Sequence, residues 1–382
     1  MFTSFRRKRD MKFTVSQKNL LEALQIVSGV VPARSTTPIL ETILFDLNEQ
    51  NLTITGTDLE VSVSTTIAPD ATEDSGSVAL PARVIIETIK ALPDIPVHFD
   101  VDENHKAKIT TDRGYYQISG FSKDNFPQLE SSVSSTKFEI DNKILGRMFS
   151  KTIFAVSSEE LRPSLMGVYL QVLPGEFRMV ATDGHRLSKI VKRGMSFEGN
   201  QINMIVPPKA VQTALKNLNS PGTTTLIIDE KSLSFQFGNT TLYTRLVEGE
   251  YPDYEKVIPR DNDKNMVVNK EMLLSSVRRV SLFSSALTHQ VSFLIDNGKL
   301  VVGSEDADVG GEAREEMQIE YSDEPMDIGY NAQYIVDILK HIDTDNVVFS
   351  LKSNVRATLI LPEDQEEDES FSMLIMPIKL NK

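Results

Sequence analysis

Three stretches of the chain share one pattern and decide its fold: KFTVSQKNLLEALQIVSG (12–29), KFEIDNKILGRMFSKTIFAV (137–156) and NMVVNKEMLLSSVRRVSLFS (265–284). Each begins with alternating apolar and polar residues, as a strand does, and continues with apolar residues spaced along one face of a helix. Their starts lie about 125 residues apart, which is the size of a whole domain. The chain is therefore predicted to hold three copies of one domain.

Two further landmarks recur in the same order and at the same period. One is a strand that ends in a polar turn and leads into another strand: LTITGTDLEVSVS (52–64), FRMVATDGHRLSKI (177–190) and LVVGSEDADVGGEA (300–313). The other is a strand, a helix and a strand: VALPARVIIETIKALPDIPVHFDV (78–101), MIVPPKAVQTALKNLNSPGTTTLIID (204–229) and MDIGYNAQYIVDILKHIDTDNVVFSL (326–351). Pro81, Pro207 and Asn331 stand at equivalent helix entrances. Each copy is expected to contain two helices and several strands.

The strand patterns and turns place each copy in the α+β class. Strands such as LTITGTDLEVSVS and SLSFQFGNTTLYTRL alternate with period two, and connections such as FGNTT and IDNGK suit hairpin turns. Few strands have the continuous apolar character of a buried parallel sheet, which argues against a doubly wound nucleotide-binding fold. We therefore expect a two-helix, antiparallel-sheet domain in three tandem copies.

Domain boundaries are predicted from proline-containing segments that follow Phe126 and Tyr251, because proline ends regular elements. The predicted domains span residues 11–135, 136–262 and 263–382. The segment MFTSFRRKRD before Met11 is basic and lacks the apolar core of a signal peptide. Residues 1–10 are expected to form a disordered basic extension.

Composition excludes several classes of protein. A hydrophobic content of 40% and a charged content of 25% are ordinary for a globular protein. No apolar run approaches the roughly 18–20 residues that a membrane-spanning helix needs, so no membrane partner is expected. Cysteine is absent, which excludes disulfides, cysteine-ligated metals and thiol nucleophiles and fits a reducing compartment. The expected location is the cytoplasm.

A net charge of −14 would by itself argue against a nucleic-acid partner, but the charge is unevenly distributed along the chain. The six predicted helices carry twelve basic and five acidic residues, so their net charge is positive. A basic helix surface would attract DNA phosphates without recognising bases. The alternative is that the basic residues are present only because they favour helix formation. Lys143, Arg147 and Lys151 recur every four residues and share one helix face. The predicted DNA contacts on helices are Arg83, Lys143, Arg147, Lys151, Lys209, Lys216, Arg278 and Arg279.

No catalytic or metal-binding motif occurs in the sequence. The five histidines lack metal-ligand spacing, and neither a Walker-type phosphate loop nor a GxSxG motif is present. Asp183 and His185 could form an acid–base pair, but no nucleophile accompanies them, so a turn capped by Asp183 is preferred. A third interpretation places this turn in a peptide pocket with Leu165, Val180 and Leu187 nearby. We expect a binding scaffold and not an enzyme, with no cofactor and no metal.

The chain resembles the bacterial β sliding clamps, the processivity subunits of DNA polymerase III, from Met11 to Leu380. The resemblance rests on MKFTV (11–15), RSTTPIL (34–40), LTITGTDLE (52–60), VATDGHRL (180–187), EGEYPDYEKVIP (248–259) and MPIKL (376–380). It implies a head-to-tail homodimer that forms a six-domain ring, with helices lining a hole around duplex DNA. It also implies tethering of the DNA polymerase III catalytic subunit, the clamp loader and other proteins that carry a clamp-binding motif.

The resemblance also assigns site residues. It implies a partner-peptide pocket between the second and third domains, formed by Leu165, Thr182, Gly184, His185, Arg186, Leu187, Pro252, Val257, Leu374, Met376, Pro377 and Ile378. It implies DNA contacts at Arg34 and Arg83. Pro163 and Ser164 stand where the family's best-known members have aromatic residues near DNA, and Lys379 replaces a usual arginine.

For the dimer, the resemblance implies pairing between an edge strand of the first domain and one of the third. The residues that match its apolar core are Tyr116, Ile118, Leu282 and Phe283. Two rival functions remain at the level of sequence. One is an enzyme that uses Asp183 and His185, and the other is a DNA-independent protein-interaction scaffold.

Overall fold

The computed structural model describes residues 11–127, 136–197, 199–218, 220–306 and 310–380. The chain packs into two compact units. The first comprises Met1–Leu145 and Lys209–Leu246, and the second comprises Gly146–Pro208 and Val247–Lys382. The predicted disordered extension, residues 1–10, lies outside the described residues.

The first unit contains a five-stranded sheet and an eight-stranded sheet, both antiparallel. The five-stranded sheet runs in the order β5 (Ala71–Asp74), β1 (Met11–Ser16), β7 (Pro96–Val101), β8 (Lys106–Thr111) and β9 (Gly114–Ser119). The eight-stranded sheet runs in the order β10 (Thr136–Asp141), β15 (Thr223–Ile228), β16 (Ser232–Phe237), β17 (Thr240–Arg245), β4 (Val61–Ile67), β3 (Leu52–Thr57), β2 (Thr42–Leu47) and β6 (Gly76–Pro81).

Strands from the first and second sequence repeats meet in the middle of the eight-stranded sheet. β17 pairs with β4 in antiparallel register, with Leu242 opposite Val63. The hydroxyls of Thr65 and Thr240 add a hydrogen bond of 2.9 Å across this junction. One sheet thus serves two repeats, which explains why the packed units do not coincide with the repeats.

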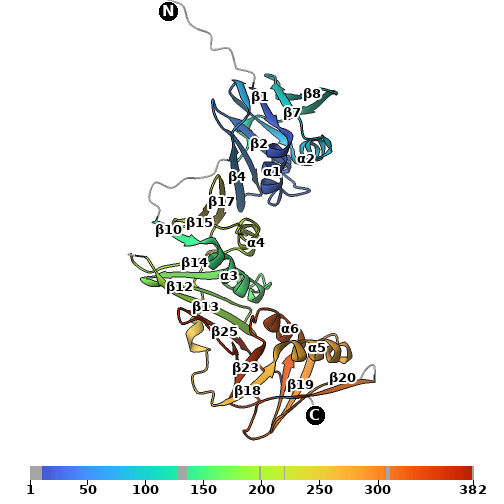
Figure 1. Cartoon of the computed structure of the whole chain (residues 1–382), viewed down its shortest axis with the longest axis vertical. Coiled ribbons are helices and arrows are strands. Elements are labelled where there is room, and N and C mark those ends of the chain that lie inside the picture. The colour runs from blue at the N-terminus through green and yellow to red at the C-terminus, as the bar shows by residue number, and fades with distance from the viewer. Residues whose placement is uncertain (1–10, 128–135, 198, 219, 307–309, 381–382) are drawn as a thin grey trace, which may run out of the picture. The chain divides into compact units, whose positions relative to one another are not determined.

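The first unit buries its apolar side chains between sheets and helices. α1 (Gln17–Ser28) packs on β3 and β4 and contacts α2 (Ala82–Ala91) (Figure 1). α4 (Pro208–Asn217) belongs almost entirely to this unit. Phe13 and Phe99 stack with their ring centroids 4.7 Å apart, and Phe45 lies against Phe99. The alternating sequence of these strands predicts one apolar face for each sheet. Burial of that face against the helices supplies hydrophobic stabilisation.

The second unit contains an eight-stranded sheet and a four-stranded sheet, again antiparallel. The eight-stranded sheet runs β14 (Ile202–Val206), β11 (Val168–Leu173), β12 (Gly175–Thr182), β13 (Arg186–Met195), β25 (Glu369–Ile375), β24 (Thr358–Pro362), β23 (Asn346–Leu351) and β18 (Lys264–Asn269). The four-stranded sheet runs β21 (Gly311–Gln318), β20 (Lys299–Asp306), β19 (Gln290–Asp296) and β22 (Met326–Asn331). Here β13 and β25 join the second repeat to the third.

Helices of the second unit cover its sheets as those of the first unit do. α5 (Lys270–Val280) and α6 (Ala332–Lys340) lie side by side in Figure 1 and contact each other. α3 (Asn142–Thr152) begins in the first unit and ends in the second. Phe293 packs edge-on against Tyr330, and Phe349 contacts Phe293 from another sheet. The described residues form six α-helices in all, two for each sequence repeat.

The strand-then-helix landmark is confirmed in every repeat, and local capping explains where the helices begin. The side chains of Ser16 and Asn269 accept hydrogen bonds from backbone N–H groups in the first turns of α1 and α5. Asp141 does the same for α3, since its Oδ1 accepts from Lys143 and Ile144. These caps satisfy N–H groups that otherwise lack partners at a helix start.

Candidate functional site

A tight turn joins β12 to β13, and the Asp183 side chain holds it together. Asp183 Oδ1 accepts hydrogen bonds from the backbone N–H groups of His185 and Arg186, each at 2.9 Å. Gly184 takes a φ of +90°, a conformation that favours glycine because it has no Cβ. The prediction of a turn capped by Asp183 is confirmed. Its carboxylate serves the backbone and Arg186, an arrangement that leaves it poorly placed to act as a base.

The first repeat forms the same turn with a different side chain at its tip. Asp58 Oδ1 accepts from the backbone N–H groups of Glu60 and Val61. Leu59 occupies the position of Gly184 and has a φ of +81°, which is costly for a branched side chain. The Thr-Asp landmark of the first two repeats is therefore a repeated structure, with leucine at the tip in the first repeat and glycine in the second.

Arg186 is the electrostatic centre of the turn in the second unit. Its Nε donates to Asp183 Oδ2 (3.1 Å), its Nη1 to Asp337 Oδ2 (2.8 Å) and its Nη2 to the Phe154 carbonyl oxygen (2.7 Å). The guanidinium carbon lies 4.5 Å from the centroid of the Tyr334 ring and 5.4 Å from that of Phe154. Buried against two aromatic rings and hydrogen-bonded to three groups, Arg186 positions the turn instead of presenting a free charge.

An apolar cluster lies where β13 and β25 pair. Its buried members are Val180, Leu187, Tyr254 and Leu374. Leu187 and Leu374 stand directly opposite each other in the register. Because Tyr254 follows β17 by a short segment, the cluster unites residues from three distant parts of the sequence.

The residues implied for the partner pocket all belong to the second unit, and they differ in exposure. Leu165, Arg186, Leu187 and Leu374 are buried, whereas the exposed members are Gly184, His185, Pro252, Val257 and Met376. Thr182, Pro377 and Ile378 are half-buried. Val257 is 56% exposed and Met376 41% exposed, so both side chains are accessible to a partner.

Backbone hydrogen bonds tie two of these segments together. The N–H of Met376 donates to the carbonyl oxygen of His185 at 2.8 Å, so the C-terminal segment continues alongside the turn. The His185 ring lies 6.3 Å from the Tyr334 ring, centroid to centroid. The structure thus brings the turn and the C-terminal segment together, as the resemblance implies, although their roles toward a peptide stay a prediction.

Three residues of this region were missed at the level of sequence: Phe154, Tyr334 and Asp337. Tyr334 and Asp337 lie on α6, where their spacing is that of an ordinary amphipathic helix. Phe154 follows α3 in a short 3₁₀ turn and stacks on His341 with centroids 4.0 Å apart. Burial lowers the pKa of His341 below its ordinary value. These three residues are identified only by their contacts with residues far away in the sequence, because no local sequence motif marks them.

The basic residues predicted to contact DNA differ in whether they form ion pairs with acidic side chains. Arg34, Arg83, Lys143 and Arg278 are exposed, and within the described part of the chain they have no ion-pair partner within 4.0 Å. Lys216 is also exposed. Others share their charge with acidic residues: Lys209 pairs with Asp58 and Arg279 with Glu315. The first group remains the best-placed set for phosphate contact.

Lys151 is a correction to the predicted DNA set, because its ammonium is enclosed by protein. Its Nζ donates to Asp343 Oδ1 at 2.7 Å and to the His341 carbonyl oxygen. The side chain is 7% exposed and lies over the Phe371 ring. Burial lowers the pKa of Lys151, although Asp343 acts in the opposite direction. A phosphate cannot reach this group in the described conformation.

Arg147 is likewise occupied by acidic partners. Its guanidinium donates to both carboxylate oxygens of Glu369, at 2.8 to 3.1 Å, and to Asp343 at 2.5 Å. The hydrogen bond to Glu369 is the largest cause of the raised pKa of Arg147. Glu369 is buried, so this pair links α3 to β25 and we remove Arg147 from the proposed DNA contacts.

Replacing Lys151 by methionine should leave DNA binding unchanged. Methionine fills a similar volume, and Asp343 keeps Arg147 as a partner. In contrast, Arg278→Met should lower the slope of log affinity against log salt by about one for each chain. Binding of a short duplex measured over a salt series tests this, with Arg278→Met as the matched comparison. A slope reduced by Lys151→Met would restore Lys151 to the DNA set.

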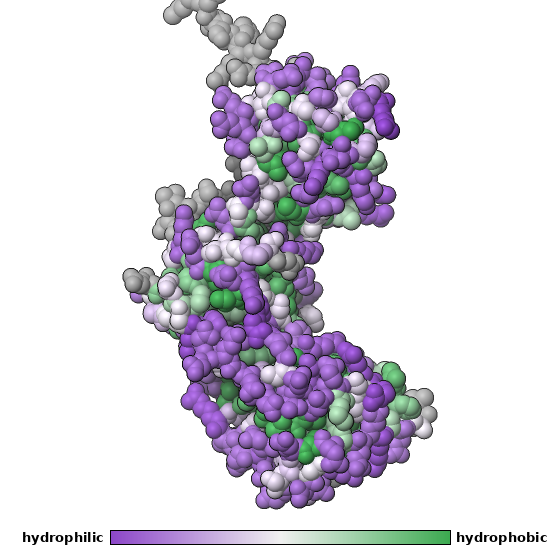
Figure 2. Space-filling view, viewed as in Figure 1, coloured by the Kyte–Doolittle hydropathy of each residue, from purple (hydrophilic) through white to green (hydrophobic). Residues whose placement is uncertain are grey.

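The residues implied for the dimer lie at two sheet edges. β9 is the outer strand of the five-stranded sheet, where Tyr116 is 43% exposed. Leu282 is 81% exposed and Phe283 44% exposed in the turn after α5. Phe283 lies against Gly311 of β21, the outer strand of the four-stranded sheet. Figure 2 shows hydrophobic surface beside the tip of the β20–β21 hairpin.

Ile118 differs in exposure from the rest of this set. Its side chain is only 6% exposed, whereas Tyr116, two positions earlier on the same face of β9, is 43% exposed. Ile118 therefore stabilises the edge strand from within. Tyr115 is 66% exposed on the other face of β9.

Two classes of feature are absent from the described residues. None of the helices there is long and apolar enough to cross a membrane. No group of three or more histidine and carboxylate side chains among those residues is arranged to hold a metal ion.

Comparison with protein families matches nearly the whole chain. Residues 11–130 match the N-terminal domain of the DNA polymerase III beta subunit, residues 139–253 its central domain and residues 255–379 its C-terminal domain. Among curated relatives, the beta sliding clamp of Pseudomonas aeruginosa is 31% identical over 372 residues, covering 97% of this chain and all of the relative. The beta sliding clamp of Chlamydia muridarum is 31% identical over 375 residues, with the same coverage.

Solved structures give the same result. A DnaN sliding clamp from Pseudomonas aeruginosa bound to griselimycin superposes with a TM-score of 0.92 at 32% identity, covering 97% of this chain and all of that one. The C. crescentus beta sliding clamp, with PEG bound to a putative beta-motif tethering region, gives a TM-score of 0.91 at 29% identity and the same coverage.

Proposed function

Because the chain belongs to the bacterial β sliding clamp family, the beta subunit of DNA polymerase III, we propose that it encircles duplex DNA and confers processivity on the replicative polymerase. Family membership carries this conclusion, since all three domains match in order. Members of this family are non-catalytic processivity factors, so the chain is not an enzyme. We place its three clamp domains at 11–135, 136–262 and 263–382, and its activity in the cytoplasm.

We propose that two chains close a ring by pairing β9 of one copy with β21 of the other. Among the residues that the structure describes, each strand is the outermost of its sheet, so its backbone N–H and C=O groups have no strand partner on one side. Unprotected edges of this kind favour pairing with another chain. The exposed side chains Tyr116, Leu282 and Phe283 would supply the apolar part of the interface. A head-to-tail contact repeated twice gives a closed and finite assembly.

DNA would be held through phosphates without base recognition. Arg34, Arg83, Lys143, Lys216 and Arg278 are the exposed basic residues proposed for this contact. The chain's negative net charge would disfavour tight electrostatic binding elsewhere on the surface. A weak phosphate contact suits a protein that must slide, because affinity comes from enclosing the duplex.

Partner proteins would dock on the second unit. The exposed Met376 follows β25, which carries Leu374 of the buried cluster, and the backbone N–H of the exposed Val257 donates to the carbonyl oxygen of Tyr254 in the same cluster. A short peptide with apolar side chains could cover this rim and so bury surface that the chain alone leaves in water. The polymerase catalytic subunit, the clamp loader and other proteins with a clamp-binding motif would compete for it.

Primer extension tests this function directly. On a primed circular template, the chain with its loader should lengthen the products that the DNA polymerase III catalytic subunit makes in one binding event. Met376→Ala should shorten those products, because it removes exposed apolar surface that the docked peptide would cover, at a cost of about tenfold in affinity. Met272→Ala is the matched control, since Met272 is 54% exposed on α5.

Products of unchanged length with the wild-type chain would contradict the clamp function. A DNA-independent scaffold would bind the polymerase equally well without lengthening its products. Shortening by Met272→Ala to the same extent would contradict the placement of the partner site.

A further inference from the structure

The rings of Phe154 and His341 form a stacked pair beside Arg186. Their centroids lie 4.0 Å apart and their planes differ by 11°. Phe154 follows α3 and His341 follows α6, so the pair joins the C-terminal ends of two helices from different repeats. Phe154 also supports Arg186 directly, because its carbonyl oxygen accepts a hydrogen bond from Nη2 and its ring lies 5.4 Å from the guanidinium carbon. His341 therefore braces a residue that holds Arg186.

His341 is fixed in place by both helices. Its Nδ1 lies 2.7 Å from the carbonyl oxygen of Asp337, one turn earlier on α6. A carbonyl oxygen can only accept a hydrogen bond, so the Nδ1–H group is the donor. The carbonyl oxygen of His341 accepts from the Lys151 ammonium, and the Ser188 hydroxyl donates to the carbonyl oxygen of Lys151. These contacts bring α3, α6 and β13 together and hold the ring against Phe154.

The surroundings of His341 favour a neutral ring. The charged groups around the stacked pair are Lys151 on α3, Arg186 on β13, Asp337 and Lys340 on α6, and Asp343 beyond α6. Both carboxylates already pair with basic side chains. Burial is the main cause of the lowered pKa of His341, and Lys151 adds to it, whereas the hydrogen bond to Asp337 opposes it. Since Nδ1 already carries a proton, a second proton at Nε2 would charge a half-buried ring close to other basic groups.

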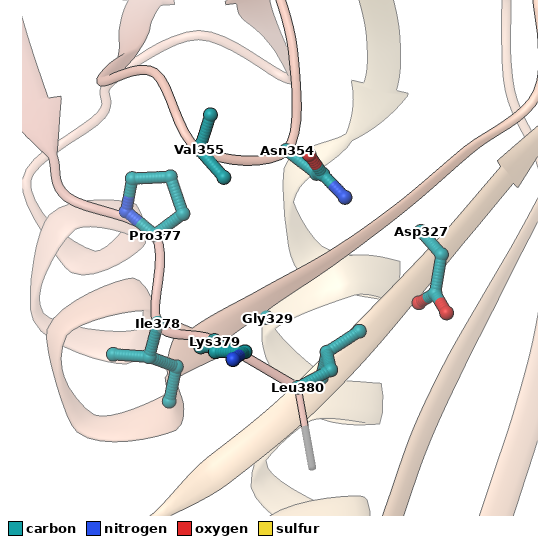
Figure 3. A pocket seen from close by; sticks show the side chains of 8 residues that line it. All are labelled: Asp327, Gly329, Asn354, Val355, Pro377, Ile378, Lys379 and Leu380. Carbon is teal, nitrogen blue, oxygen red and sulfur yellow. The ribbon is translucent and has the colours of Figure 1, made fainter. Parts of the chain in front are cut away.

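The turn that Arg186 positions in turn determines where Met376 lies. The N–H of Met376 donates to the carbonyl oxygen of His185 in that turn, at 2.8 Å. Beyond Met376 the segment is held separately, because the N–H of Ile378 donates to the carbonyl oxygen of Gly329 at 2.9 Å. Figure 3 shows this part of the segment passing Gly329. A displaced Arg186 would therefore move His185 and Met376, while β22 keeps the segment beyond them in place.

We propose that His341 is a positioning residue of the partner site, whose neutral ring stacks on Phe154 and so holds Arg186, the turn and Met376 in the geometry that binds a partner peptide. The inference rests on the proposed function. His341 acts through Phe154 and Arg186 and needs no contact of its own with the peptide. A second proton on the ring weakens the stack, so partner affinity decreases as the pH falls.

Three substitutions separate the stack from the hydrogen bond to Asp337. His341→Ala removes both, His341→Phe keeps the stack, and His341→Asn keeps an N–H donor but loses the aromatic ring. Binding of a fluorescent peptide with the clamp-binding segment of the polymerase III catalytic subunit is measured on the full-length chain at pH 7.5. His341→Ala and His341→Asn should weaken binding about fivefold, whereas His341→Phe should stay within twofold of wild type.

The pH profile supplies a second readout, which a purely structural role would not change. Between pH 7.5 and pH 5.0 the wild-type chain should lose about fivefold more affinity than His341→Phe, because the phenylalanine ring cannot take up a proton. His185 and the peptide titrate equally in both proteins, so the difference reports on His341. His98→Ala is the matched control, since His98 is exposed on β7 of the first unit, and it should keep the wild-type affinity and pH profile.

Thermal unfolding of each variant at pH 7.5 verifies that the fold is retained. Binding by His341→Ala within twofold of wild type would overturn the inference. Rescue by asparagine but not by phenylalanine would also overturn it, because the hydrogen bond to α6 would then be the important contact. Identical pH profiles for the wild-type chain and His341→Phe would contradict the need for a neutral ring. Failure of the wild-type chain to bind the peptide would instead overturn the proposed partner site.

Discussion

Replacing Leu282 and Phe283 together with aspartate should convert the protein from dimers to monomers in analytical ultracentrifugation. Both side chains are exposed in the turn after α5, at 81% and 44%, so the chain itself does not need them to fold. In a dimer they would be buried, and two carboxylates without partners in an apolar contact cost several kcal/mol. The dissociation constant should rise by at least about a hundredfold.

The control for this prediction is Leu161→Asp. Leu161 is 95% exposed, but it lies in the segment between α3 and β11 and belongs neither to β9 or β21 nor to the turn after α5. This variant should stay dimeric at the same concentration. A Leu282→Asp, Phe283→Asp double variant that sediments as a dimer would contradict the assignment of these residues to the interface.

Arg186→Ala should weaken partner-peptide binding by roughly a hundredfold while the fold is retained. The change removes three charge-assisted hydrogen bonds and leaves the carboxylates of Asp183 and Asp337 without their shared partner. It also removes the cation–π contacts of the guanidinium with the rings of Phe154 and Tyr334. The turn then loses its fixed geometry, and with it the alignment of His185 and Met376.

Isothermal titration with the peptide and thermal unfolding should be measured on the same preparation. Arg193→Ala is a suitable control, since Arg193 is an exposed arginine at the far end of β13. A peptide affinity within twofold of wild type would show that Arg186 does not position the site. Arg186→Lys should restore little of the peptide affinity that Arg186→Ala loses, because lysine cannot reproduce the planar set of guanidinium N–H donors.

Sequence periodicity predicted the fold well because local features determine each repeat. The strands before α1, α3 and α5 alternate clearly, and the helices after them begin at residues that can cap them. The pairing of β4 with β17 and of β13 with β25 was not predictable in this way. Those strands belong to different repeats, and their register depends on apolar faces that match only once both repeats have folded.

The charged residues show where sequence reasoning has less power. Lys143, Arg147 and Lys151 do share a helix face, as their spacing predicts. Spacing does not reveal what packs against the end of that face. Asp343 lies 192 residues after Lys151 in the sequence, and Glu369 lies 222 residues after Arg147. Lys151 is consequently buried, whereas Lys143 remains exposed.

The partner site shows the same division. The turn at Asp183 was predictable, since Asp followed by Gly is a strong turn signal. Its aromatic and acidic supports, Phe154, Tyr334 and Asp337, come from elements that carry no motif. Long-range contacts of this kind are set by tertiary packing, so they were visible only in the structure.

The measurement that tests the central claim most directly compares retention of the loaded protein on circular DNA before and after linearisation. A closed ring holds circular DNA by topology, so the protein should stay bound through gel filtration at a salt concentration that screens phosphate contacts. A single cut should release it, because the ring slides off the free ends. Equal retention on circular and linear DNA, or loss from both at moderate salt, would contradict the proposed function.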